Sequence, residues 1–288
     1  MTSASDTLTR AEALAAGFSP LLMQTVQAAQ NMARGTHGRR KSGMGEAFWQ
    51  FRPWQTGDAS RRIDWRQSAK RETLFVRETE KETAQTALMW RDASGSMLFS
   101  GERDRLRKKD YAETLLLALS LLMLDAGERV GILGSPLPPQ TGVHSIQKIN
   151  GTLNDAPLPF GTDANRAKIV LLSDFYFPLE TTATLCATLS AAGCEGVIVQ
   201  VADPAEQKLP GWGHVKFQDI EDADGAALEF NSVESLRADY ASAFSSHRES
   251  LLHIAQRLGW GYEFILTDVP LAQSLARVYQ RLSVKVRA

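Results

Sequence analysis

Short apolar runs alternate with helix-like segments from Thr86 to the end of the chain. The runs read as buried strands at 86–91, 129–133, 168–174, 196–201 and 262–266. The segments between and after them carry helical patterns at 105–126, 181–192, 232–258 and 271–282. A strand that is apolar along its whole length has to be buried on both faces of its sheet. Parallel sheets meet this need, because helices cover both of their faces. The alternation therefore predicts an α/β fold with an open, mostly parallel sheet and helices on both faces.

Two segments interrupt this alternation. Residues 143–149 are interpreted as a short strand with alternating apolar and polar side chains. Two further short runs, 214–217 and 226–230, flank the acidic turn at 221–225. Strand-like runs on either side of an Asp/Gly turn are typical of a hairpin. We expect a hairpin inserted in the α/β domain.

Composition narrows the class of protein. The net charge is −1, which gives no global field for nucleic acid or an anionic membrane. The longest apolar run, Leu115–Leu124, is shorter than the roughly 20 residues that cross a bilayer. Residues 1–16 lack the basic start and apolar core of a signal peptide. We expect a soluble, cytoplasmic protein with neither nucleic acid nor direct membrane insertion among its interactions.

The chain divides by composition into three parts, which are a helical N-terminal segment (1–34), a basic, aromatic-rich segment (35–85) and the α/β domain (86–288). The first contains helical patterns at 8–16 and 19–33. From Arg34 to Lys81 there are twelve Lys and Arg against six Asp and Glu. We expect this basic extension to pack on the α/β core.

Within the basic extension, one short run mixes arginines with an aromatic residue, as protein interfaces do. Its candidate partner-binding residues are Arg61, Arg62, Asp64 and Trp65. An internal network, in which the acids pair with arginines and the tryptophans pack, explains the same pattern. Nucleic-acid binding is the third reading, and the interspersed acids disfavour it.

The chemistry-bearing residues follow two of the expected strands. Asp92, Ser94 and Ser96 come directly after the strand at 86–91, and Asp174 ends the strand at 168–174. Ligands of open α/β sheets bind at the carboxyl ends of strands. Carboxylate and hydroxyl oxygens suit Mg²⁺, for which Mn²⁺ substitutes. The alternative is an Asp and a Ser/Gly turn that cap the next helix.

Motifs for enzymatic chemistry are missing from the sequence. There is no phosphate-binding Gly-x-x-x-x-Gly-Lys-Ser/Thr and no Gly-x-Ser-x-Gly nucleophile turn. The five histidines are scattered, so no general base stands beside the Asp92 loop in the sequence. We expect a protein that is not an enzyme. A metal-dependent hydrolase acting at the same strand ends is the rival from another class.

The sequence resembles a bacterial family, the domain of unknown function 58 family, which is built on the von Willebrand A fold. The resemblance spans about 35–201 and rests on dispersed motifs. These are Gly43-Met44-Gly45-Glu46, Trp54-Gln55-Thr56-Gly57-Asp58, Arg61-Arg62-Ile63-Asp64-Trp65, Asp92-Ala93-Ser94-Gly95-Ser96-Met97, Lys109-Asp110-Tyr111-Ala112 and Leu171-Leu172-Ser173-Asp174.

The resemblance implies a von Willebrand A-like sheet and a non-catalytic adaptor or chaperone partner of MoxR-type AAA+ ATPases. It also implies a metal-ion-dependent adhesion site, in which both serines bind Mg²⁺ directly and a partner's acidic residue completes the coordination. A separate Thr normally adds a ligand, and Thr162 is the candidate. It lies only twelve residues before Asp174, too close for the helix that usually intervenes. Without that ligand, the alternative is a metal-free scaffold.

Overall fold

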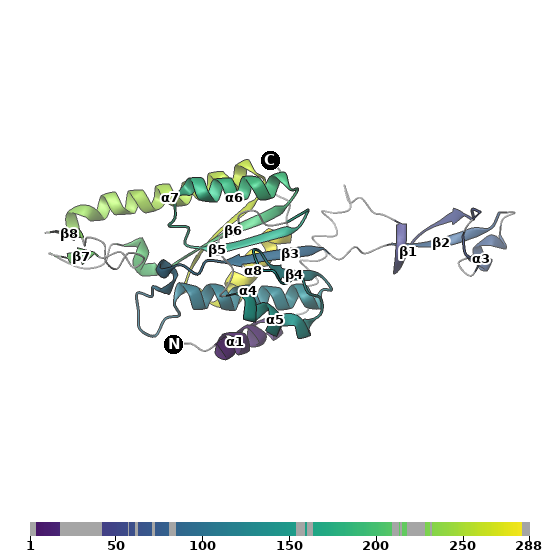
Figure 1. The fold of residues 1–288 in the computed structure, drawn as a ribbon, viewed down its shortest axis with the longest axis horizontal. Helices are drawn as coiled ribbons and strands as arrows, with labels where there is room; N and C mark the ends of the chain where they lie inside the picture. Colours follow the sequence, from purple (N-terminus) through teal and green to yellow (C-terminus); the bar gives the residue numbers. More distant parts are fainter. Residues whose placement is uncertain are drawn as a thin grey trace. The chain divides into compact units, whose positions relative to one another are not determined.

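A computed structural model gives the fold of the chain. It describes residues 4–17, 42–56, 58–60, 63–70, 73–80, 85–153, 159, 164–208, 213, 215–217, 228–230 and 232–283. The chain forms two compact units, one of residues 31–84 and one of residues 1–30 together with 85–288. The larger unit contains the α/β sheet (Figure 1).

Five parallel strands form the sheet of the larger unit, in the order β4-β3-β5-β6-β9. Their bounds are β3 (Thr86–Arg91), β4 (Arg129–Ile132), β5 (Lys168–Ser173), β6 (Glu195–Ala202) and β9 (Gly261–Leu266). Strands β3, β4, β5 and β6 are buried along nearly their whole length, as expected for a sheet with helices on both faces, whereas the edge strand β9 is mostly half-buried. The predicted α/β class with a parallel sheet is confirmed.

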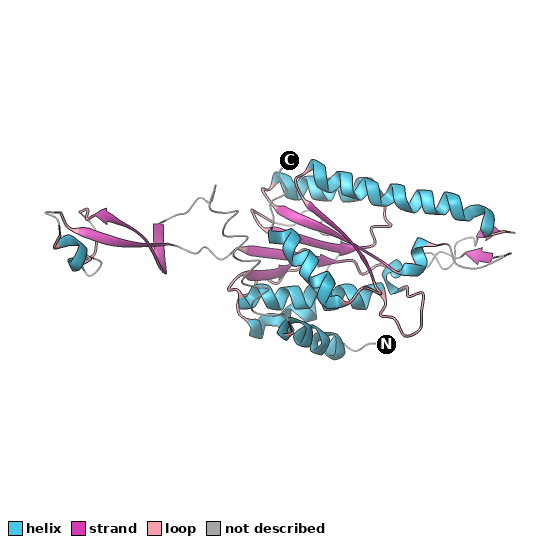
Figure 2. Ribbon diagram, turned by 180° about the vertical axis from the view of Figure 1, so that it is seen from behind, coloured by secondary structure: helices cyan, strands magenta, loops and turns pink. Residues whose placement is uncertain are grey.

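Helices cover both faces of this sheet (Figures 1 and 2). One face carries α1 (Ala4–Ala16), α4 (Lys108–Asp125) and α5 (Ile146–Thr152), and the other carries α6 (Leu179–Ala191) and α7 (Arg237–Arg257). The last helix, α8 (Leu271–Ser283), packs against α4, β6 and β9. Within the described residues, no helix is both long and apolar enough to cross a bilayer.

Helix α4 is the centre of the packing on its face of the sheet. Fifteen of its 18 residues are buried, because α1 covers the side that the sheet leaves open. A helix that is apolar all round needs such complete coverage. The run Leu115–Leu124 is therefore a core helix, and the N-terminal helix completes the core of the same unit.

One expected strand is wrong. Residues 143–149 form a 3₁₀ turn, η3 (Val143–Ser145), followed by α5. Ile146, Ile149 and Leu153 are buried at spacings of three and four, which is the period of a helix and not of a strand. Val143, Ile146 and Ile149 already recur at every third position in the sequence, so the alternating interpretation was mistaken.

The inserted hairpin is confirmed, with β7 (Val215–Phe217) and β8 (Leu228–Phe230) paired antiparallel. The long helical pattern begins with a 3₁₀ turn, η5 (Glu234–Leu236), and continues as α7. The helix expected at 8–16 is present and begins earlier, at Ala4. The helix expected at 19–33 lies outside the described residues.

The smaller unit is built on an antiparallel pair, β1 (Ser42–Pro53) and β2 (Phe75–Glu80), with the short helix α3 (Trp65–Ser68) between them. The buried Ser68 hydroxyl accepts a hydrogen bond from Phe75 N at 2.8 Å and donates to Asp64 O at 2.7 Å. This hydroxyl ties α3 to the start of β2.

Gly196→Ala is expected to lower the free energy of unfolding by about 1–3 kcal/mol, the usual cost of overpacking a core. A Cβ there would lie 2.7 Å from the ring of buried Trp260 and 3.0 Å from Ile169 O. Urea unfolding measures the change. Gly151→Ala in α5 is the control, because a Cβ there meets nothing within 4 Å. Equal stability of the two variants would contradict the expectation.

Candidate functional site

The site lies where the strand order reverses. From β3 the chain passes to β4 on one side and later to β5 on the other, so the carboxyl ends of β3 and β5 frame the switch point at which α/β sheets bind ligands. Asp92 follows β3 and Asp174 follows β5, and both are buried. Asp92 N donates to Leu172 O at 2.9 Å. The structure brings these two carboxylates to one edge of the sheet.

Asp92 is held by hydrogen bonds to both of its carboxylate oxygens. Its Oδ1 accepts from Ser94 N at 2.8 Å, and its Oδ2 accepts from the Ser173 hydroxyl at 2.6 Å. The Ser173 oxygen in turn accepts from Phe175 N at 2.7 Å. The carboxylate therefore links its own loop to the loop after β5.

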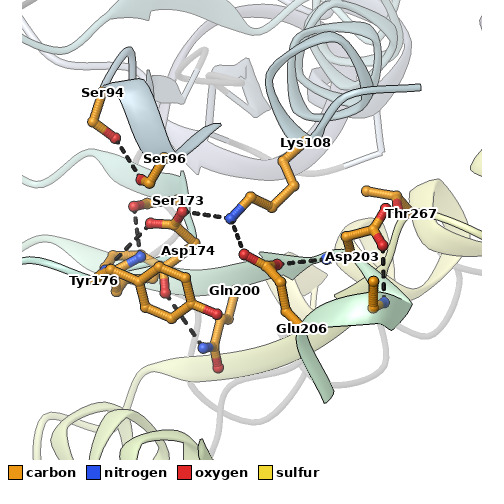
Figure 3. Close-up of polar contacts among 12 residues, drawn as sticks. Ser94, Ser96, Lys108, Ser173, Asp174, Tyr176, Gln200, Asp203, Glu206 and Thr267 are labelled. Carbon is orange, nitrogen blue, oxygen red and sulfur yellow. Dashed lines mark hydrogen bonds and ion pairs between the residues drawn. The ribbon is translucent and has the colours of Figure 1, made fainter. Parts of the chain in front are cut away.

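Ser94 and Ser96 present their hydroxyls together beside this carboxylate. Ser94 directly precedes η2 (Gly95–Leu98), a 3₁₀ turn that brings Ser96 next to it. Their Oγ atoms lie 3.1 Å apart, and both residues are half-buried (Figure 3). Adjacent oxygens around octahedral Mg²⁺ are about 2.9 Å apart, given metal–oxygen distances of about 2.0–2.1 Å. The spacing of the two hydroxyls fits direct coordination of this ion.

Asp174 is engaged by a lysine that sequence reasoning did not single out. Its Oδ2 accepts from Lys108 Nζ at 2.7 Å, and its Oδ1 accepts from Tyr176 N at 3.2 Å (Figure 3). Lys108 Nζ also donates to Glu206 Oε1 at 2.5 Å, and the lysine is fully buried. Because an ammonium ion already pairs with it, Asp174 fits a metal less well than Asp92 and the serines do.

Two aromatic rings complete the surroundings of Lys108. Its Nζ lies 4.9 Å from the centroid of Tyr176 and 5.9 Å from that of Phe99. A buried cation gains from such ring faces where water is excluded. Burial raises the pKa of Glu206, and the neighbouring Lys108 opposes that rise. Lys108 thus connects the start of α4 with the chain after β5 and after β6.

A third strand also ends in an aspartate. Asp203 follows β6 and begins the 3₁₀ turn η4 (Pro204–Gln207) as part of a capping box with Glu206. Its Oδ1 accepts from Ala205 N at 2.9 Å and from Arg105 Nη1 at 3.1 Å. Its Oδ2 accepts from the Thr267 hydroxyl at 3.0 Å. This carboxylate anchors three segments and is fully buried.

Sequence reasoning missed Lys108, Asp203 and Glu206. For Asp203 a signal was present, because a strand-like run ends in Asp-Pro-x-Glu, the pattern of a capping box with proline in the first turn. Lys108 carries no such local signal. Its partners lie 66 and 98 residues away along the chain.

The other predicted site residues are spread over different places. Thr162, Arg61 and Arg62 lie outside the described residues. Asp64 caps α3, accepting from Gln67 N at 2.9 Å, so its carboxylate has a structural partner. Trp65, the first residue of α3, is 65% exposed and is available for an interface.

The donors at the edge fit a divalent ion in part. No group of three or more His, Cys, Asp or Glu arranged for a metal occurs in the described part of the chain. Asp92 and the two serines nevertheless form the oxygen-rich set that Mg²⁺ prefers. The carboxylates of Asp92, Asp174 and Glu206 against the single ammonium of Lys108 leave a formal charge of −2, which a divalent cation would balance.

Together, the fold and this edge define an open parallel α/β protein with a polar site at its switch point. The family model "Protein of unknown function DUF58" matches residues 50–250, and the chain belongs to this family.

Relatives of the chain in mycobacteria are described as uncharacterized proteins. The chain is 28% identical over 276 residues to the uncharacterized proteins Mb1516 of Mycobacterium bovis and Rv1480 of Mycobacterium tuberculosis, covering 88% of this chain and 85% of each relative. Among solved structures, an aerotolerance-related membrane protein of Bacteroides fragilis aligns with a TM-score of 0.39 and 15% identity, over 69% of this chain and 98% of that one.

Asp203 is expected to stabilise the protein in a pH-dependent way. Burial raises the pKa of its carboxyl, but hydrogen bonds from Ala205 N, Gly101 N, Thr267 and Arg105 outweigh this and leave the pKa lowered. A lowered pKa contributes stability that is present above the unfolded-state pKa of about 4 and is lost as the pH falls through the folded-state value.

Urea unfolding of the wild type and Asp203→Asn between pH 7 and pH 3 tests this. The wild type should exceed the variant most at pH 7, and the difference should shrink below about pH 4. Asp104→Asn, at an exposed position in the loop before α4, is the control and should show no such trend. A difference between wild type and Asp203→Asn that does not change with pH would contradict the assignment.

Lys108→Met is expected to lower the free energy of unfolding by about 3–5 kcal/mol, because it leaves two carboxylates without their buried cation. Adding Asp174→Asn should recover part of that loss. Lys109→Met, at the neighbouring half-buried position, should change stability by no more than about 0.5 kcal/mol. Urea unfolding measures all three variants. A Lys108→Met protein as stable as the wild type would show that the buried ion pairs do not hold this edge.

Proposed function

We propose that this protein is a non-catalytic, cytoplasmic adaptor that captures a partner protein at the carboxyl edge of β3 and β5. The observation that carries the proposal is the pair of serine hydroxyls, 3.1 Å apart and half-buried beside the buried Asp92. The base of this site is held by hydrogen bonds to both Asp92 oxygens, while Ser94 and Ser96 are half-buried and so partly accessible. A rigid base with accessible polar groups suits recognition.

Asp92, Ser94 and Ser96 are the residues that would hold Mg²⁺ or Mn²⁺, with Thr162 as a further candidate ligand. The bound ion would supply a positive charge that accepts a carboxylate of the partner. Asp174 adds negative charge to the edge, and its pairing with Lys108 assigns it a supporting position. The formal charge of −2 supports binding of a dication.

The partner we propose is a MoxR-type AAA+ ATPase, on the basis of the resemblance to the family alone. The von Willebrand A-like character of the sheet belongs to the same proposal. The switch-point position of the Asp-x-Ser-x-Ser loop is consistent with both.

A second candidate is a scaffold that binds its partner without a metal. The buried ammonium of Lys108 favours it, because this cation already compensates Asp174 and Glu206. The serine hydroxyls would then bind the partner directly through hydrogen bonds. The two candidates share one surface and differ in their need for a divalent ion.

The hydrolase alternative has less support from the geometry. Among the described side chains at this edge, Asp92 accepts hydrogen bonds at both oxygens, and Lys108 is held between two carboxylates. A general base needs to reach a substrate proton and give it up again. Asp92 and Lys108, buried and paired in this way, serve structure better than proton transfer. His247, whose ring centroid lies 5.8 Å from that of Tyr176, is a further titratable group near this edge.

Calorimetric titration with Mg²⁺ and capture of a purified MoxR-type ATPase test the proposal. We expect Ser96→Ala and Asp92→Ala to weaken Mg²⁺ binding at least ten-fold and to abolish capture of the ATPase. Ser250→Ala is the matched control, because its hydroxyl donates only within α7, to Ser246 O. Circular dichroism establishes that each variant is folded.

The outcomes separate the candidates. Capture that needs Mg²⁺ and Ser96 supports the metal-dependent adaptor. Capture that persists in a chelator but needs Ser96 supports the metal-free scaffold. Capture that is unchanged in Ser96→Ala and Asp92→Ala would overturn both, because the partner would then bind elsewhere.

A further inference from the structure

Exposed apolar side chains flank the serine pair. In the part of the larger unit that the structure describes, the exposed large hydrophobic residues are Leu98, Val143 and Tyr176. Leu98 is 47% exposed and lies two residues after Ser96, and Tyr176 is 43% exposed and lies two residues after Asp174. Two of the three therefore border the proposed binding edge. Apolar side chains gathered at a polar site mark an interaction surface.

The aromatic rings of Phe99 and Tyr176 are held at this edge by their contacts with Lys108. Phe99 and Tyr176 both lie over Lys108 Nζ, at 5.9 Å and 4.9 Å from their centroids. Figure 3 shows the Tyr176 ring beside Asp174 and Gln200. Moving either ring away would uncover the buried ammonium. Phe99 and Tyr176 are therefore held in place. Together with the exposed Leu98, two residues after Ser96, they are here called the apolar rim.

The loop that follows the rim favours a negatively charged occupant. Arg105 pairs with Glu102 and Asp203, whereas Arg103 and Arg107 have no side-chain partner among the described residues. Arg103 is exposed and Arg107 is half-buried. Helix α4 begins at this edge as well, and its N-terminal dipole end favours anions. Asp104 is exposed in the same loop, so residues 100–107 have a net charge of +1, which together with the helix N-terminus complements an acidic segment.

We infer that the partner presents an acidic residue with a large apolar side chain two positions away from it. The inference rests on the proposed function, in which the carboxylate goes to Ser94 and Ser96. Ser96 and Leu98 are two residues apart in a 3₁₀ turn, about 4 Å along its axis and about 120° apart around it. At about 3.3 Å per residue, an extended segment spans such a separation in about two residues. The apolar side chain then packs on the apolar rim.

Charge distinguishes this occupant from a segment of the same chain. The unit of residues 31–84 carries twelve Lys and Arg against seven Asp and Glu, so its overall charge has the wrong sign for the arginine-bearing loop. A second copy of the protein is the other possible occupant, and the experiment includes it as an outcome.

Fluorescence anisotropy with labelled nine-residue peptides in a Gly/Ser background tests the inference in the presence of Mg²⁺. One peptide has Glu with Leu two positions away, a second replaces Leu with Ser, and a third replaces Glu with Gln. On the wild type, the Leu–Glu peptide should bind about ten-fold more tightly than the Ser–Glu peptide, because it buries an apolar side chain. Leu98→Ser should remove this preference.

Val143→Ser is the matched control, because Val143 is 39% exposed but lies in η3, outside the apolar rim. It should keep the ten-fold preference. Both substitutions remove exposed side chains, so both variants should fold, which circular dichroism verifies.

Several results would overturn the inference. Equal binding of the Leu–Glu and Ser–Glu peptides would overturn the inference. If that binding still required Ser96, the proposed adaptor site itself would remain supported. Absence of peptide binding would remove the rim as a specificity element, while Mg²⁺ calorimetry reports on the proposed site separately. Leu–Gln binding as tight as Leu–Glu would refute the acidic partner. If sedimentation showed a dimer for the wild type but not for Leu98→Ser, the apolar rim would be an interface with a second copy of the protein.

Discussion

The buried ammonium of Lys108 sets the arrangement of the functional edge. A cation without access to water costs several kcal/mol unless it is well paired. Lys108 meets this requirement with Asp174, Glu206 and two aromatic rings. Those groups come from the chain after β5, the turn η4 and the chain before α4. Satisfying one charge therefore places three separate segments around the switch point.

Hydrogen bonds extend this constraint to the Asp92 loop. Ser173, which precedes Asp174, donates to Asp92, and Asp92 accepts from Ser94 N. The inner part of the edge is thus buried and fully engaged, whereas Ser94, Ser96, Leu98 and Tyr176 remain partly accessible. The separation explains how one site combines a rigid base with a surface that a partner can reach. Recognition groups work best when the groups beneath them are held in this way.

Much of the fold was predictable because its signals are local. Apolar runs bounded by polar loops predicted the strands, and the two aspartates expected at strand ends do lie at one edge of the sheet. The segment 143–149 was misinterpreted as a strand, although Val143, Ile146 and Ile149 recur at every third position, which is a helical spacing. Asp203 was overlooked, although the sequence shows that it follows a strand-like run and begins a capping-box pattern.

The sequence by itself determined the class of the sheet, the Asp-x-Ser-x-Ser loop and the all-apolar helix that must be buried, because each depends on neighbouring residues alone. Only the tertiary structure decided what Asp174 contacts. Its cation comes from a lysine 66 residues earlier, and the second carboxylate lies 98 residues beyond that lysine. Such pairings depend on strand order and helix placement, which no local pattern encodes. The same holds for the apolar rim, whose members come from two loops that meet only when β3 and β5 pair.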